Sequence, residues 1–327
     1  MNKTELRTDL LIRLVFMAVI YVAFATFLPT YHSLNGVAVL LDGAVLIGLA
    51  SVGIGVTMLA GEFDLSVGSL AAVIGIVVTN VIIGGSAVLP AIAIGVAAAA
   101  AVGALQGFVI AVTGINSLVF TIGTLIGLRG LALVISNENS VTIPIERLDE
   151  TDFLGHRILA ILTPLSITII VVFVVVALFL RFTVWGREIY AIGGGRAEAR
   201  AAGVSILRPM ILAFALSGAL AGLAGALISV KLGSATPLGF DTLLLSAVTA
   251  CLMGGIGLEG GKGTVFGIFI GLLTLRFLVG GVASLGAPYW LQSLAIGLLL
   301  IIVIVVQLSM RIVRSRRAPV RRIPQAA

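Results

Sequence analysis

The chain has 327 residues, of which 60% are hydrophobic and only 10% are charged, and its mean hydropathy is +1.23. A soluble globular domain carries about 25% charged residues, so this composition excludes a soluble protein. The apolar runs are continuous rather than alternating, which excludes a transmembrane β-barrel. We therefore expect an integral membrane protein built from α-helices.

Ten apolar runs are read as membrane spans, because a helix of about 20 residues crosses the hydrocarbon core of a bilayer. They cover residues 11–31, 36–60, 65–84, 87–114, 117–136, 159–180, 209–230, 242–258, 263–283 and 288–309. The first run follows basic residues as a signal peptide does, but no small-residue cleavage site comes after it, so we expect a retained first helix. The sequence thus predicts an all-α fold of about ten transmembrane helices, with residues 1–310 as one domain.

The basic residues are distributed unequally along this topology, and basic loops stay on the cytoplasmic side of a membrane. With the N-terminus inside, the cytoplasmic side receives three basic residues near the N-terminus, five in segment 181–208, Lys262, and six after residue 310. The other five are the external Arg147, Arg157 and Lys231 and the intramembrane Arg129 and Arg276. We expect both termini and a basic tail, residues 311–327, in the cytoplasm. This bias and contact with anionic lipid account for the net charge of +6 without a nucleic-acid partner.

Two polar segments separate apolar runs. The acidic segment (residues 137–158) is the largest external one, and it is interpreted either as a solvated loop or as part of a docking face for an external partner; its carboxylates are Glu138, Glu146, Asp149, Glu150 and Asp152. The polar segment (residues 181–208) holds five arginines and two glutamates on the cytoplasmic side. Two interpretations of this segment are open. Its arginines only hold the loop on the cytoplasmic side, or the segment is a surface that contacts a soluble partner.

No catalytic or metal-binding constellation is recognisable. His32 and His156 lie at predicted span ends, and Cys251 is the single cysteine, so neither residue type offers metal-ligand spacing. The string 257–264 is not a GxxxxGK[ST] phosphate loop, because a glycine follows Lys262. We therefore expect the chain not to be an enzyme and to bind no cofactor or metal itself.

Two glycine-rich segments interrupt the spans, and unwound backbone inside a membrane is tolerated only where protein or water satisfies it. The first glycine-rich segment, residues 61–69, has the sequence GEFDLSVGS. The second glycine-rich segment, residues 253–264, has the sequence MGGIGLEGGKGT. The first brings two carboxylates, Glu62 and Asp64, and two hydroxyls, Ser66 and Ser69, to the mouth or the interior of the bundle.

Four motifs resemble, in the same order, those of the ribose-type permease family, the membrane subunits of bacterial sugar ABC importers. Residues 61–69 resemble GGxDLSVGS, residues 120–130 resemble FxxTLGTxxxxRG, residues 186–204 resemble GRxxYAIGGNxxAARxxGI, and residues 254–263 resemble GGTSxxGGRGxxxG. The resemblance extends from about residue 40 to residue 300. It implies a multi-pass protein of the bacterial plasma (inner) membrane that forms the path for a solute.

The resemblance also implies partners: a cytoplasmic ABC ATPase that binds ATP and Mg, a periplasmic or extracellular solute-binding protein, and a second permease subunit in a homo- or heterodimer. It implies that the polar segment couples the ATPase to the membrane helices, with apolar contacts from Ile189, Ile192 and Ala199. The residues assigned to coupling are Gly186, Arg187, Glu188, Tyr190, Ala191, Gly193, Gly194, Arg200 and Gly203.

Polar residues of the spans and of their breaks are candidates for the substrate path. They are Asp64, Ser66, Ser69, Thr121, Thr124, Arg129 and Asp241. Thr121 and Thr124 share a helix face, which suits a pore lining and equally suits hydrogen bonds to their own backbone. Asp42, Arg129 and Arg276 each cost roughly 2.5–3.5 kcal/mol at mid-bilayer unless they are paired or face water. A polar path and a structural ion pair both remain open for them.

Departures from the family pattern leave the substrate open. Glu62 stands where the family has glycine, Gly195 where it has asparagine, and residues 244–246, Leu-Leu-Ser, where it has Glu-Leu-Asp. A sugar, a polyol, a sugar-derived signal and a nucleoside all remain candidates. The alternative function is an ion- or proton-coupled secondary transporter acting alone, for which Asp42 is the one plausible mid-span carboxylate. Rows of small residues at 97–107 and 217–225 fit close helix packing or a permease–permease interface.

Overall fold

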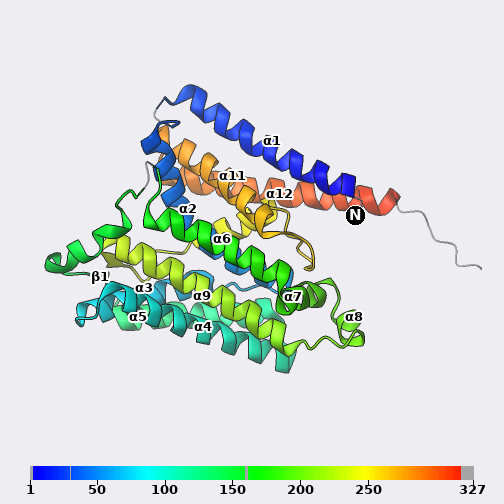
Figure 1. Ribbon diagram of the computed structural model, residues 1–327, viewed down its shortest axis with the longest axis horizontal. Helices are drawn as coiled ribbons and strands as arrows, with labels where there is room; N and C mark the ends of the chain where they lie inside the picture. The colour runs from blue at the N-terminus through cyan, green and yellow to red at the C-terminus, as the bar shows by residue number, and fades with distance from the viewer. Residues whose placement is uncertain (1–2, 30, 159–160, 318–327) are drawn as a thin grey trace, which may run out of the picture.

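The computed structural model describes residues 3–29, 31–158 and 161–317, and most of its helices run along the long axis of the molecule (Figure 1). The α-helices are α1 (Lys3–Phe27), α2 (Leu34–Leu59), α3 (Val67–Ile83), α4 (Val88–Thr113), α5 (Ser117–Ser136), α6 (Pro164–Phe182), α7 (Val184–Gly194), α8 (Arg196–Ala201), α9 (Leu207–Leu232), α10 (Leu243–Met253), α11 (Val265–Ser284) and α12 (Tyr289–Arg317). The remaining elements are the two-residue strands β1 (Val141–Thr142) and β2 (Ser234–Ala235) and the 3-10 helices η1 (Ile145–Glu150) and η2 (Asp152–Leu154).

Within the described residues, eight helices are long and apolar enough to cross a membrane, and the shorter apolar helices α3 and α10 occupy the other two predicted spans. The prediction of a span over 242–258 was wrong in its extent. The helix α10 stops at Met253, because the following Gly254–Gly255 pair forms a turn in which Gly255 has a φ of +81°. Eleven residues at 1.5 Å each span about 16 Å, roughly half of the hydrocarbon core.

The ends of the chain differ from the expectation in a similar way. The first helix begins at Lys3, before the predicted residue 11, and it packs against α11. The basic tail expected from residue 311 is helical as far as Arg317, where α12 ends, and residues 318–327 lie outside the described part of the chain. The start of α1 and the end of α12 lie at the end of the molecule that carries α7 and α8, while β1 lies at the opposite end (Figure 1).

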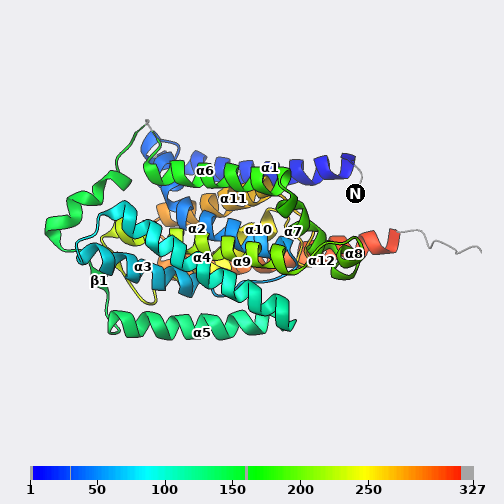
Figure 2. The ribbon, with the colours of Figure 1, turned by 60° about the horizontal axis from the view of Figure 1, so that its bottom comes forward.

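The core lies where α9 packs against α2, α3 and α4. The helices α4 and α9 approach closely because glycines face the backbone of the partner helix: a Cβ atom on Gly107 would lie 2.7 Å from the carbonyl oxygen of Met210, and one on Gly103 or Gly218 would also meet backbone atoms. The two rows of small residues therefore pack against each other inside one bundle, as one of the two interpretations predicted. Figure 2 shows α5 at the edge of this bundle, well exposed.

The acidic segment is folded and is tied to the helices. Its strand β1 pairs with β2 in an antiparallel register, Val141 opposite Ala235. Arg147 donates hydrogen bonds to the carbonyl oxygens of Ile82, in the last turn of α3, and of Ser86, in the turn that follows, and it forms an ion pair with Glu150 at 2.8 Å. All five carboxylates nevertheless remain exposed, so the choice between a solvated surface and a docking face stays a prediction.

Candidate functional site

The polar segment forms two short helices across the end of the bundle. The helix α7 begins after Thr183, whose hydroxyl accepts a hydrogen bond from the backbone N–H of Gly186 at 3.0 Å. Gly186 itself faces the last turn of α6, where a Cβ atom would lie 2.6 Å from the carbonyl oxygen of Phe179. The helix α8 is followed by Gly203 at a φ of +80°, a conformation that favours glycine. Glycine at 186 and 203 is therefore required by the local geometry.

The apolar side of these helices faces the protein's own bundle. Ile189 and Ile192 are buried, at 0% and 2% exposure, because α7 packs against α6, α9 and α2. Ala199 of α8, which packs against α7, is also buried, at 5% exposure. The expectation that these three residues offer apolar contacts to a partner was therefore wrong. The exposed residues of the assigned set are Arg187, Gly194, Arg200 and Gly203, whereas Glu188, Tyr190, Ala191 and Gly193 are partly buried.

Beneath α7, three chain segments meet through glycine backbones. We call Gly61, Gly193, Gly260 and Gly261 the glycine junction. The N–H of Gly261 donates to the carbonyl oxygen of Leu59 at 2.9 Å, and a Cβ atom on Gly260 would lie 2.6 Å from Cα of Gly61. The three glycines outside α7 have φ angles of +66° to +83°. A Cβ atom would overlap with backbone at Gly193, Gly260 and Gly261, whereas at Gly61 the left-handed φ favours glycine. The polar segment thus contacts both glycine-rich segments directly through backbone atoms.

Tyr190 adds a side-chain contact to the junction. Its hydroxyl donates to the carbonyl oxygen of Gly263 at 3.1 Å. Burial raises the pKa of Tyr190, which keeps the hydroxyl protonated and able to donate at neutral pH. This hydrogen bond fixes α7 to the second glycine-rich segment.

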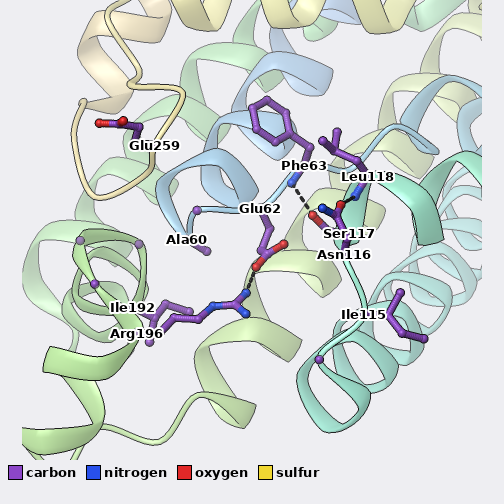
Figure 3. Close-up of a pocket in the computed structure, with 15 residues that line it drawn as sticks. Ala60, Glu62, Phe63, Ile115, Asn116, Ser117, Leu118, Ile192, Arg196 and Glu259 are labelled. Carbon is purple, nitrogen blue, oxygen red and sulfur yellow. Dashed lines mark hydrogen bonds and ion pairs between the residues drawn. The ribbon is translucent and has the colours of Figure 1, made fainter. Parts of the chain in front are cut away.

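A recess of about 610 Å³ opens beside the glycine junction, between the polar segment, the first glycine-rich segment and the start of α5 (Figure 3). Glu62 and Arg196 form an ion pair across it, and the N–H of Phe63 donates to the hydroxyl of Ser117 at 3.1 Å. The carboxylate of Glu62 is largely buried, at 9% exposure, whereas the Arg196 side chain is 40% exposed. Burial and the charge of Arg200 lower the pKa of Arg196, which still remains a cation because arginine titrates far above neutrality.

Asp64 lies in a buried polar cluster rather than in the recess. Its carboxylate accepts hydrogen bonds from the N–H of Ser66 at 3.0 Å, from the Ser66 hydroxyl at 2.6 Å and from the Ser217 hydroxyl at 2.8 Å. The side-chain amide of Gln106 donates to the Ser66 hydroxyl at 3.1 Å. This cluster connects the first glycine-rich segment to α9 and α4. Ser69, in the first turn of α3, is half-buried.

The two threonines of α5 bond to backbone. The hydroxyl of Thr121 donates to the carbonyl oxygen of Ser117 at 2.8 Å, and that of Thr124 donates to the carbonyl oxygen of Phe120 at 3.0 Å. Thr121 is fully buried, and its hydroxyl also lies 3.3 Å from the carbonyl oxygen of Phe63. Of the two interpretations of this pair, the structure shows hydrogen bonds to the helix's own backbone.

The costly intramembrane charges differ in their partners. Arg129 forms an ion pair with Asp241 at 3.2 Å, with both side chains about half exposed, and Asp42 pairs with Lys231 at 3.4 Å and accepts a hydrogen bond from Thr163. Both Asp42 and Arg129 are thus paired in the structure, and whether either lies on the solute path stays a prediction. For Arg276, no carboxylate lies within ion-pair distance among the described residues, and its Nε has no hydrogen-bond partner there.

The seven candidates for the substrate path therefore do not converge on one site. Asp64 and Ser66 lie in the buried cluster, and Thr121 lies next to it at the start of α5. Arg129 lies eight residues further along α5 than Thr121, about 12 Å away at 1.5 Å per residue. Among these seven candidates, Arg129 and Asp241 are the two that form an exposed ion pair in the described part of the chain.

Two contributors were missed in the sequence. Arg196 belongs to the polar segment, but the motif assigns no role to its position, and Ser217 stands in a row of small residues that is explained by packing. Glu62 gave a signal, because a carboxylate that replaces a glycine next to a membrane span needs a cation or water nearby. The position of its partner in the chain could not be read from the sequence.

Comparisons with known proteins agree with this arrangement of helices and motifs. Residues 37–304 match the family described as "Branched-chain amino acid transport system / permease component". The chain belongs to this permease family. It is 34% identical to the L-arabinose ABC transporter permease protein of Azospirillum brasilense over 88% of this chain and 84% of that protein. No solved structure matches the chain.

Two further relatives come from Escherichia coli strain K12. The permease is 32% identical to the ribose import permease protein over 90% of this chain and 92% of that protein. It is 31% identical to the D-allose transport system permease protein, with 87% of each chain covered. The resemblance to ribose-type monosaccharide permeases is confirmed by these relatives, and so is a multi-pass protein of the bacterial inner membrane.

Proposed function

We propose that the permease is the membrane subunit of an ABC importer, that it forms the path for a sugar or sugar-like solute, and that a separate cytoplasmic ABC ATPase drives it. One observation carries the proposal. The outer face of the polar segment exposes Arg187, Gly194 and Arg200, while its inner face contacts the glycine-rich segments through backbone atoms. A partner that moves α7 and α8 would therefore move the helices that begin and end at the junction.

The energy source follows from the same proposal. ATP and Mg bind on the partner ATPase, and this chain supplies the docking surface and the moving helices. The arginines of that surface suit acidic groups on the ATPase, because exposed guanidinium groups pair with carboxylates. A second permease subunit, the same or different, completes the pathway.

A periplasmic or extracellular binding protein delivers the solute to the end of the molecule that carries the acidic segment. The named relatives handle L-arabinose, ribose and D-allose, which supports a monosaccharide as the cargo. Arg129 and Asp241 are the best-placed candidates to meet its hydroxyls, because they are charged and half exposed. In the described arrangement Asp64 and Ser66 are buried and already bonded to one another, so we assign them to structure.

The alternative, a secondary transporter acting alone, would need a carboxylate that is free to take up and release an ion or a proton. Asp42 is the candidate, but it is already engaged by Lys231 and Thr163. An ion-coupled cycle would have to break both contacts in every turnover. This favours the ATP-driven importer.

Reconstitution tests the proposal. The permease is placed in proteoliposomes with its ATPase, and uptake of radiolabelled ribose, L-arabinose and D-allose is measured with the binding protein outside and ATP inside. We expect uptake that requires all components and stops when a non-hydrolysable ATP analogue replaces ATP. Uptake by the purified permease alone, driven by an ion or proton gradient, would overturn the proposal.

The docking surface is tested by a matched pair of arginine variants. Arg200→Ala changes a motif residue of the exposed surface, and Arg208→Ala changes an exposed arginine of the polar segment outside the motif. If the polar segment docks the ATPase, Arg200→Ala lowers ATP-driven uptake while membrane insertion is unchanged, and Arg208→Ala leaves both near wild type. Equal effects of the two variants on insertion would favour the topological interpretation of the arginines.

A further inference from the structure

The ion pair between Glu62 and Arg196 is a second contact between the polar segment and the first glycine-rich segment. The two residues are 134 positions apart in the chain, and the pair crosses the recess (Figure 3). Glu62 follows Gly61 of the glycine junction directly, and Arg196 comes three residues after Gly193. The same two segments are thus joined twice, once by backbone and once by charge.

Two contacts constrain motion more than one does. The glycine junction limits how closely the segments approach, but contact at one place does not by itself prevent one segment from rotating against the other. An ion pair beside that point resists the rotation. The carboxylate of Glu62 is largely buried, so the loss of Arg196 would leave it without its counter-charge in a site where an unpaired charge is unfavourable.

The residues that follow Glu62 carry this constraint into the membrane helices. The N–H of Phe63 donates to Ser117, the first residue of α5, and Asp64 bonds to Ser217 of α9. A displacement of Arg196 therefore reaches the start of α5 through residues 62–63 and the middle of α9 through residue 64. Arg129, which pairs with Asp241, lies further along the same α5.

We propose that Glu62 and Arg196 are positioning residues that transmit the movement of α7 and α8 to α5 and α9. This role rests on the proposed function. The ion pair acts through its charges, and neither residue binds the solute. Its loss slows transport and wastes ATP, while the affinity for the solute is kept. A purely structural pair would change stability alone.

A charge-reversal cycle in the complete reconstituted transporter tests the role. The variants are Glu62→Gln, Arg196→Met, Glu62→Arg, Arg196→Glu, and the double exchange of Glu62→Arg with Arg196→Glu. Arg208→Met is the matched control, because it removes an exposed arginine of the polar segment that lies outside the motif and does not line the recess. The measurements are the maximal rate and KM of uptake, the ATP hydrolysed per solute transported, and the thermal unfolding of each variant.

We expect each single variant to lower the maximal uptake rate roughly tenfold, a size within the range for residues in direct contact, and to raise the ATP consumed per solute. KM should change less than about twofold, because the pair does not touch the solute. The double exchange should recover most of the lost rate, and Arg208→Met should behave as wild type.

Several results would overturn the role. Single variants with wild-type rates and wild-type ATP consumption would show that the pair transmits nothing. A fall in unfolding temperature that fully accounts for the loss of uptake, or a double exchange that recovers no rate, would make the pair structural. Failure of the proposed function is seen separately, in a wild-type permease whose uptake does not depend on ATP.

Discussion

The two ends of the permease are held together by different kinds of contact. At the end with α7 and α8, the segments meet through glycine backbones, and a hydrogen bond joins Gly261 to Leu59. At the opposite end, the acidic segment is held largely by long side chains such as Arg147, and a two-residue strand pair adds to them. Glycine backbones packed at Gly193, Gly260 and Gly261 leave no room for a larger side chain, whereas the long side chains at the opposite end can change conformation.

This difference suits the two tasks that we propose. Backbone packed on backbone leaves no flexible side chain between the segments, so a push on one displaces the other, and this suits an end that receives force from an ATPase. Exposed ion pairs are worth about 0–1 kcal/mol each and can rearrange, so they suit an end that meets a mobile binding protein. Substitutions at the two ends should therefore differ greatly in effect.

The largest effect is expected from a single methyl group in the glycine junction. A Cβ atom on Gly193 would overlap with the carbonyl oxygen of Leu59 and lie 2.7 Å from the backbone nitrogen of Gly261, so Gly193→Ala should lower the free energy of unfolding by about 3 kcal/mol and abolish coupled uptake. Thermal unfolding in detergent and ATP-driven uptake measure the two effects.

The neighbouring residue supplies the control. A Cβ atom on Gly194 would meet no atom within 4 Å, so Gly194→Ala should leave stability unchanged or raise it by up to about 1 kcal/mol. Its effect on uptake depends on the ATPase, because Gly194 belongs to the exposed surface. Equal destabilisation by the two substitutions would contradict the close packing described for the junction.

A smaller effect is expected from the buried cluster, which joins the junction end to the core. Asp64→Ala leaves the donors of Ser66 and Ser217 without their acceptor, which should destabilise the permease by about 2–3 kcal/mol. Ser217→Ala removes one donor and should cost about 1 kcal/mol. Denaturation in detergent mixtures measures both. A larger loss from Ser217→Ala than from Asp64→Ala would show that the carboxylate is not the centre of the cluster.

Sequence alone located most of the helices, because hydropathy reports burial in lipid directly. Predicted spans from residue 36 to residue 230 agree with helices within five residues at each end. The end of α10 was misplaced, because hydropathy continues past Met253 while the backbone turns at Gly255. Hydropathy averages over a window and does not detect a left-handed glycine.

The candidate site was located less well, because motifs identify segments and not the faces of helices. The motif led correctly to the polar segment, but the apolar residues Ile189 and Ile192 pack inward, since the apolar side of a surface helix is stabilised by its own protein. The ion pair of Glu62 with Arg196 joins distant parts of the chain. Such a pairing depends on the tertiary structure, and a local sequence motif cannot predict it.

At the opposite end, effects should be smaller still. Arg129 and Asp241 are 45% and 56% exposed, so a double-mutant cycle with Arg129→Met and Asp241→Asn should give a coupling energy of at most about 1 kcal/mol for unfolding. Uptake is the more sensitive measurement: if the pair meets the solute, either variant raises KM. A coupling energy above 2 kcal/mol would show that this pair is desolvated, and the contrast between the two ends would then fail there.

The smallest effect concerns the tether of the acidic segment and its dependence on pH. The hydrogen bond from Arg147, and then its charge, lowers the pKa of Glu150 below the ordinary value of about 4.3. The contribution of the pair to stability is therefore present above the unfolded pKa and is lost as pH falls through the lowered folded pKa. A spin label at Asp152→Cys should become more mobile as the pH falls below the ordinary range of a glutamate carboxyl, with buried Cys251 left unlabelled. If Glu150→Gln shows the same mobility change over the same pH range, the pH response of the acidic segment comes from a contact other than the Arg147–Glu150 ion pair.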